Sequence, residues 1–160
     1  MSEKQLLVLN YVAHARDHNL KANEIRSSWK WPLAIWHILC SVSYAKLAAA
    51  IGVGVYDQIS VVVLILVRTP VWLGGDYKLG SKMLKKALED HQTGAQKLPS
   101  HIQVLFLLLH RECLLRQNLE WLAAVNLRDA REIVSRANPE QATKICEILR
   151  KLHVNQKTLV

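Results

Sequence analysis

The segment from Trp29 to Ala50 restricts the fold more than any other part of the sequence. It opens with three tryptophans in eight residues, Trp29-Lys-Trp-Pro-Leu-Ala-Ile-Trp36, and Pro32 suits the first turn of a helix. This helix would be apolar on every side, and such helices are normally buried on most sides. The chain is 51% apolar and 21% charged over 160 residues, which is enough to build a core. The sequence therefore predicts a folded, tryptophan-rich and apolar N-terminal half.

Apolar residues recur at helical spacing along most of the chain, which predicts an all-α protein, a compact bundle of six to seven helices. One segment, Ile59–Val67, is β-branched and nearly continuous, so a buried strand stays open as the alternative to a helix there. The expected helices are Glu3 to Asn19, Pro32 to Ala50, Ile59 to Val67, Ser81 to His91, Ser100 to Gln117, Asn126 to Ala137 and Pro139 to His153, with a short helical turn at Glu24 to Ser28.

Capping residues predict where several of these helices begin. A side-chain oxygen just before a helix can accept a hydrogen bond from a free amide of the first turn. The predicted caps are Ser81, Ser100 paired with Gln103, Asn126 paired with Asp129, and Asn138 followed by Pro139.

The chain length fits one domain or two small ones. The Gly74-Gly75 pair marks a loop, and the stretch Thr93–Ser100 reads as a linker. We therefore expect an N-terminal helical region of residues 1–95 and a C-terminal helical region of residues 96–160, or one continuous domain.

Leu47–Val67 is the candidate for a membrane-spanning segment. It has 21 residues but contains Gly52, Gly54 and Asp57, and an aspartate near the bilayer centre costs roughly 2.5–3.5 kcal/mol. A buried segment of a soluble core is favoured, so membrane contact is not expected. The N-terminus carries an early acid and only a short apolar stretch, and the three cysteines are isolated. These features predict a reduced, cytoplasmic location without a secretory signal.

No motif predicts catalysis or a bound cofactor. The patterns GxSxG, GxxxxGK[ST] and GxGxxG are all missing from the sequence. His14 and His18 have the four-residue spacing by which two imidazoles face one metal on a helix, but no third ligand is identifiable. Solvated surface histidines are the favoured interpretation. We expect a protein that is not an enzyme and holds neither metal nor cofactor.

Positive charge is the feature that points to a partner. The formal net charge is +8, and four lysines without an intervening acid, between Lys78 and Lys86, have the spacing that places them on one helical side. Lysines and arginines that neutralise phosphates release counterions, so such a chain can bind a polyanion, although a solvated face is the alternative. The predicted phosphate-binding residues are Lys78, Lys82, Lys85, Lys86, Arg128 and Arg131.

The tryptophans allow two interpretations. Trp29 and Trp31 flank Lys30, the combination that stacks on single-stranded nucleic acid. Trp36, Trp72 and Trp121 stand among aliphatic residues, where packing in a core is expected.

The stretch Leu119-Glu-Trp-Leu-Ala-Ala-Val-Asn-Leu-Arg-Asp-Ala-Arg-Glu-Ile-Val-Ser-Arg-Ala-Asn138 resembles a signature of FlhD, the helical subunit of the bacterial flagellar master transcription activator. The resemblance implies an all-helical subunit that dimerises and joins a zinc-binding partner, FlhC, on promoter DNA. It also implies that Arg128 and Arg131 face the DNA. Because this chain lacks a four-cysteine set, it would be the FlhD-like half. Residues 1–95 have no counterpart in the family, and the segment linking the matched helices is shorter.

Charge placement and the resemblance together predict a DNA-associated transcriptional regulator subunit, an FlhD-like activator that binds double-stranded DNA as an oligomer with a partner protein. The alternative is a helical adaptor or chaperone-like module that binds another protein through the apolar first half. A small membrane protein is the third interpretation.

Overall fold

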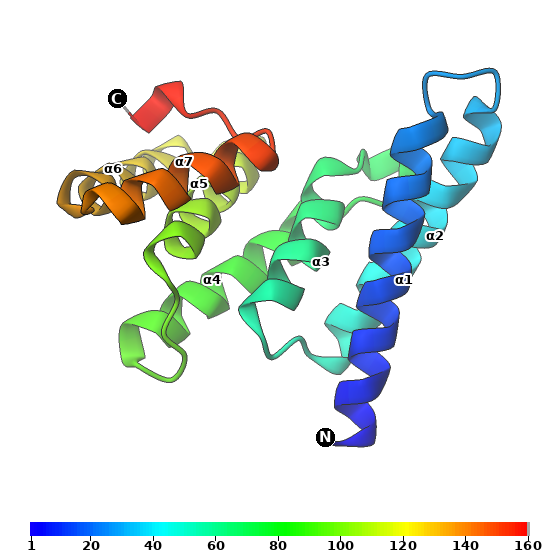
Figure 1. The fold of residues 1–160 in the computed structure, drawn as a ribbon, viewed down its shortest axis with the longest axis horizontal. Coiled ribbons are helices and arrows are strands. Elements are labelled where there is room, and N and C mark those ends of the chain that lie inside the picture. The colour runs from blue at the N-terminus through cyan, green and yellow to red at the C-terminus, as the bar shows by residue number, and fades with distance from the viewer. Residues whose placement is uncertain (160) are drawn as a thin grey trace. The chain divides into compact units, whose positions relative to one another are not determined.

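The protein folds into helices throughout the part that the structure describes (Figure 1). This computed structural model describes residues 1–159, apart from the side chain of Thr158. No strand occurs within these residues, so the predicted all-α class is confirmed. The elements are α1 (Glu3–Ile25), α2 (Trp31–Ile51), α3 (Tyr56–Arg68), the 3₁₀ turn η1 (Val71–Leu73), α4 (Tyr77–Thr93), α5 (Ser100–Arg116), α6 (Glu120–Arg136), α7 (Pro139–Lys151) and the 3₁₀ turn η2 (Lys157–Leu159).

The chain divides into two compact units, which we call unit 1 (Met1–Gly80) and unit 2 (Ser81–Val160). The division falls inside α4, whose first turn belongs to unit 1. The regions expected from the sequence would instead meet at residues 95 and 96, in the loop that follows α4.

Unit 1 is built on the pairing of α1 with α2, which run side by side (Figure 1). Small side chains make this pairing close: Ala15 and Ala22 of α1 and Ala45 of α2 are almost completely buried. The buried Ser41 hydroxyl donates a 2.7 Å hydrogen bond to the backbone oxygen of Ala15. A buried polar group with a partner avoids the cost of desolvation, so Ser41 fits within this contact.

The third helix of unit 1 supplies most of its large core side chains. Helix α3 is formed by the β-branched run for which helix and strand were both open, and helix is confirmed. Val62, Val63, Leu66 and Val67 are completely buried. Helix α3 packs against both α1 and α2, and it ends at Arg68, one residue beyond the predicted end at Val67.

Unit 2 forms around α5, which contacts α6 and α7. The six consecutive residues from Val104 to Leu109 are all buried, with Phe106 the largest of them. Ala123 and Ala130 of α6 are also buried, as are Ile145 and Leu149 of α7. Helix α5 is therefore surrounded by apolar side chains on most of its circumference.

Cys113 lies in this core and should be chemically inert in the folded protein. Burial raises the pKa of its thiol to about 12, and the thiolate is the reactive form. We expect a thiol-alkylating reagent at pH 8 to modify the exposed Cys146 within minutes and to leave Cys113 unmodified until the protein unfolds. Peptide mass spectrometry of protein alkylated with and without urea checks this order. Equal modification of the two thiols in the native protein would contradict the burial of Cys113.

The predicted cap of the last helix is confirmed. The Asn138 side chain accepts a 2.8 Å hydrogen bond from the Gln141 backbone amide, and the Gln141 side chain accepts one from the Asn138 amide. Pro139 occupies the first helical position. All three residues act within one turn, so the signal is readable in the sequence.

Two other predicted helix starts, at Ser81 and Asn126, are wrong, and one predicted cap does not form. Helix α4 begins at Tyr77 rather than Ser81, because the Asp76 carboxylate accepts a 2.9 Å hydrogen bond from the Leu79 amide. Helix α5 begins at Ser100 as predicted, but Pro99 is at its cap position and no side chain caps it, so the Ser100 capping box does not form. Helix α6 begins at Glu120 and runs straight through Asn126.

The first helix is also longer than expected. It continues through Asn23 to Ile25, so the predicted end at Asn19 and the separate turn at Glu24 are wrong. The pairing with α2 explains the extension, because Ala22 is buried in the contact between the two helices.

The tryptophans lie on the surface, and the expectation that Trp36, Trp72 and Trp121 pack in a core is wrong. Aliphatic residues and Phe106 fill the two cores instead. The exposed fractions of the five tryptophans are 83% for Trp29, 57% for Trp31, 52% for Trp36, 78% for Trp72 and 77% for Trp121.

The candidate membrane segment of the sequence is not one helix. Residues 52–55 separate α2 from α3 within Leu47–Val67. Among the described residues, the helix that is long and apolar enough to cross a membrane is α2, a property that core helices share.

Candidate nucleic-acid interface

Four of the six predicted phosphate-binding residues share one side of α4 by helical spacing, which we call the lysine face: Lys78 in the first turn, within unit 1, and Lys82, Lys85 and Lys86 in unit 2. At 100° per residue these positions occupy roughly 100° of the helix circumference. All four side chains are exposed, and none takes part in an ion pair with a described residue. The opposite side of α4 carries the buried Leu84 and Ala87. The lysine face is therefore a set of exposed lysines, in register along α4, without an ion-pair partner among the described residues.

The lysine face ends at an acidic residue. Glu89 lies one turn beyond Lys85 and Lys86 and is also exposed. No ion pair joins it to a lysine in the described part of the chain. A polyanion would therefore lie along the N-terminal half of α4, away from Glu89.

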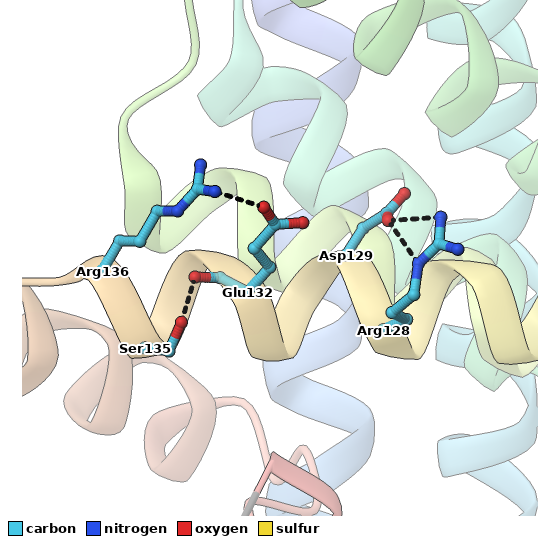
Figure 2. Close-up of polar contacts among 5 residues, drawn as sticks. All are labelled: Arg128, Asp129, Glu132, Ser135 and Arg136. Carbon is cyan, nitrogen blue, oxygen red and sulfur yellow. Dashed lines mark hydrogen bonds and ion pairs between the residues drawn. The ribbon is translucent and has the colours of Figure 1, made fainter.

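The other two predicted residues, Arg128 and Arg131, are exposed on α6 among carboxylates. Figure 2 shows the Arg128 guanidinium turned toward Asp129, with Nη2 3.2 Å from the carboxylate Oδ1. Glu132, one turn after Arg128, pairs with Arg136 of the following turn at 2.6 Å. Helix α6 therefore presents alternating charges rather than an uninterrupted basic surface.

A groove of about 410 Å³ in unit 2 brings Lys85 close to α5 and α6. Its polar lining is of mixed charge and comprises Lys85, Glu89, His110, Asp129, Glu132 and Arg136, among other residues. Carboxylates at this density would repel a phosphate, so the groove does not extend the lysine face. Its mixed lining instead suits a neutral or zwitterionic group.

One pair of residues in this groove had no signal in the sequence. The Asn126 side-chain nitrogen lies 2.9 Å from Nδ1 of His110. An amide nitrogen can only donate, so Nδ1 accepts and the proton of neutral His110 is on Nε2. Burial, with a smaller effect from the Lys85 charge, lowers the pKa of His110 and favours this neutral form. Asn126 therefore lies in the interior of α6, where its side chain bonds His110, and it does not cap the helix.

A second cluster of titratable residues lies between α1 and α2. His18 and His37 approach each other with their Nδ1 atoms 2.8 Å apart, and the rings of His14 and His18 both stack on Tyr44. The sequence interpretation of solvated histidines holds for the exposed His14, whereas His18 is partly buried. No group of three metal-ligating side chains occurs within residues 1–159.

The contact between His18 and His37 should make unit 1 less stable in acid. Burial is the main cause that lowers the pKa of His18, and the charges of His37 and Lys21 lower it further. Asp17 raises this pKa slightly, and His14 lowers it slightly. Since the folded pKa lies below the unfolded value of 6.5, stabilisation is complete above pH 6.5 and declines as the pH falls below it. We expect the urea midpoint to be lower at pH 5.5 than at pH 7.5.

Tryptophan fluorescence suits this measurement because four of the five tryptophans lie in unit 1. His37→Gln removes one of the two facing charges, so its midpoint should depend less on pH. His110 of unit 2 also has a lowered pKa, so it too makes the protein less stable in acid. This effect is present in both the unaltered protein and the His37→Gln variant. An unchanged pH dependence in His37→Gln would contradict the assignment.

Comparisons of the chain with protein-family models, curated proteins and solved structures find no match. The resemblance of residues 119–138 to FlhD stays a prediction from the sequence.

Proposed function

We propose that the protein binds double-stranded DNA through the lysine face of α4, as a subunit of a transcriptional regulator. The observation that carries the proposal is the set of four exposed lysines on one side of a single helix, none of them in an ion pair with a described residue. Each phosphate that they neutralise releases counterions, which favours binding at moderate salt. The net charge of +8 adds a long-range attraction to the same partner.

The dimensions of the lysine face suit a phosphate backbone. Lys86 is eight positions after Lys78, which is about 12 Å along a helix. Successive phosphates on one strand are about 3.4 Å apart along the DNA axis, so this length matches three to four of them. Flexible lysine side chains can adjust to the curvature of the backbone.

Arg128 and Arg131 have a secondary role in this proposal. The pair between Arg128 and Asp129 is exposed, and exposed pairs contribute about 0–1 kcal/mol, so a phosphate can compete with the carboxylate. None of the six residues reads base edges in the proposal. A partner protein, FlhC-like if the resemblance holds, would supply sequence choice in an oligomeric complex.

The proposal is tested by titrating a fluorescent duplex with the protein from 50 to 200 mM salt. Binding through about four phosphates predicts that log K falls with log salt at a slope near −3.6. Undetectable binding, or binding that ignores salt, would overturn the proposal. A single-stranded probe of the same length tests whether tryptophan stacking contributes instead.

A helical adaptor that binds another protein is the second candidate, and the exposed tryptophans and leucines of unit 1 favour it. It predicts that a complex with a protein partner survives nuclease treatment and that changes to the lysine face leave that complex intact.

A further inference from the structure

Helix α2 buries its small side chains and exposes its large ones. The buried residues are Ala34, Ser41, Val42, Ala45 and Ala48. The opposite side carries what we call the outer face of α2: Leu33, Trp36, Leu39 and Leu47, each between 43% and 52% exposed. Helices of water-soluble proteins normally bury the large apolar side, so the outer face requires a partner that is itself apolar.

The sequence that forms and flanks the outer face is basic and contains no acid. From Ile25 to Tyr56 the sequence has no aspartate or glutamate, whereas Arg26, Lys30 and Lys46 are all exposed. Two further exposed tryptophans, Trp29 and Trp31, lie at the start of α2. The Lys30 ammonium lies 5.5 Å from the centre of the Trp29 ring. Apolar area, tryptophans and cations therefore occur together on α2 and in the residues that directly precede it.

A third element adds to this region. The 3₁₀ turn η1 packs against α2, and its residues Val71 and Trp72 are exposed. Gly74, which directly follows η1, lies beside Val42 and the end of the Lys46 side chain. Exposed aromatic and basic groups thus flank α2 at two points along its length.

We propose that the outer face of α2 docks unit 1 on an anionic membrane surface. Leu33, Trp36, Leu39 and Leu47 enter the boundary between headgroups and acyl chains. Tryptophans favour this depth because their rings are apolar and their N–H groups can still reach water. Arg26, Lys30 and Lys46 meet the negative headgroups, and no carboxylate on this stretch opposes them.

The helix lies on the membrane rather than crossing it. Helix α2 pairs along its length with α1, which carries the charged residues Arg16, Asp17, Lys21 and Glu24. Asp17 and Lys21 form an exposed ion pair at 3.1 Å. Inserting α2 across a bilayer would take these charges into the hydrocarbon or break the close pairing of α1 and α2.

Charge also argues against a second copy as the occupant. Two outer faces in a symmetric dimer would bring their own Lys30 and Lys46 side chains together, with no acid on either α2 to neutralise them. Like charges brought together across an interface weaken it. An anionic lipid surface provides both the apolar layer and the compensating charge.

The test is co-sedimentation of the full chain with vesicles, at 100 mM salt. One set contains neutral phosphatidylcholine alone and the other contains three parts phosphatidylcholine to one part phosphatidylglycerol. We expect binding to the anionic vesicles at least tenfold tighter than to the neutral ones, with a blue shift of tryptophan emission. Trp36→Ser with Leu39→Ser should weaken this binding tenfold or more, and Lys30→Gln with Lys46→Gln should weaken it on anionic vesicles only.

The matched control is Trp121→Ser with Leu122→Ser, which removes the same two side-chain types from exposed positions of unit 2. It should bind as the unaltered protein does, and circular dichroism should show equal helix content in every variant. A variant with Lys78, Lys82, Lys85 and Lys86 changed to glutamine separates the outer face from the lysine face and should keep its vesicle binding.

Three results would overturn the proposal. The first is no sedimentation with anionic vesicles, and the second is a Trp36→Ser, Leu39→Ser variant that binds as well as the control. The third is a dimer of the unaltered protein, seen by analytical ultracentrifugation, that is lost in the Trp36→Ser, Leu39→Ser variant, while neither the unaltered protein nor this variant binds vesicles. That result would assign the outer face to a second copy.

Discussion

Changing Lys78, Lys82, Lys85 and Lys86 together to glutamine is expected to weaken duplex DNA binding by at least about a hundredfold at 50 mM salt. Four lost phosphate contacts remove four counterion-release terms, so the slope of log K against log salt should become flatter by about 3.6. All four side chains are exposed, and glutamine forms helices about as well as lysine, so the fold should persist. Fluorescence anisotropy across the salt series measures both quantities.

A control with the same loss of charge separates position from net charge. Lys4, Lys97, Lys151 and Lys157 are also exposed, and changing them to glutamine lowers the net charge by the same four units. We expect this variant to lose much less affinity. If both variants weakened DNA binding equally, the attraction would depend on overall charge, and the lysine face would have no particular role.

Gly75→Ala is expected to cost about 3 kcal/mol or more of unfolding free energy. A Cβ at this position would lie 1.8 Å from the backbone oxygen of Thr69 and 2.6 Å from its carbonyl carbon. Backbone atoms cannot move aside as a flexible side chain can, so the loop between α3 and α4 must open. The change would also disturb the hydrogen bonds from Gly75 N to Pro70 O and from Asp76 N to Leu66 O.

Urea unfolding followed by tryptophan fluorescence measures this loss, since unit 1 holds most of the tryptophans. Gly54→Ala is the matched control, because a Cβ there meets no atom within 4 Å. Its expected effect is below about 1 kcal/mol. Similar unfolding free energies for the two variants would contradict the close approach of Gly75 to Thr69.

The helical content was readable from the sequence because it depends on neighbours within one or two turns. Pro32 and the Asn138 cap both act on the residues that follow them directly, and both predictions are confirmed. Ser81 and Asn126 have the same capping chemistry but lie inside helices. Their helices start earlier because Asp76 and Glu120 stand further upstream, and several good helix formers follow each of them.

Burial was harder to predict, and α2 shows why. Its sequence is apolar on every side, which led to the expectation that most of it is covered. The pairing with α1 instead depends on close approach of the two backbones, and only small side chains such as Ala45 and Ala48 allow this. Composition indicates which residues avoid water, but the partner helix decides which of them are covered.

In the candidate site too, features local in the sequence were predictable and contacts between helices were not. The lysine face was predictable because its four members lie on one helix, within nine residues. The neutralisation of Arg128 by its neighbour Asp129 was also within reach of the sequence. The contacts of His18 with His37 and of Asn126 with His110 join residues 19 and 16 positions apart, on different helices. No local pattern contains that information.

The buried run from Val104 to Leu109 has a consequence for the order in which the protein is made. Helix α5 has little side left for water, so it gains its stability from α6 and α7, both of which follow it in the chain. In a nascent chain leaving the ribosome, these apolar side chains therefore stay exposed to solvent until α7 has emerged. During that interval the exposed apolar side chains of α5 favour aggregation.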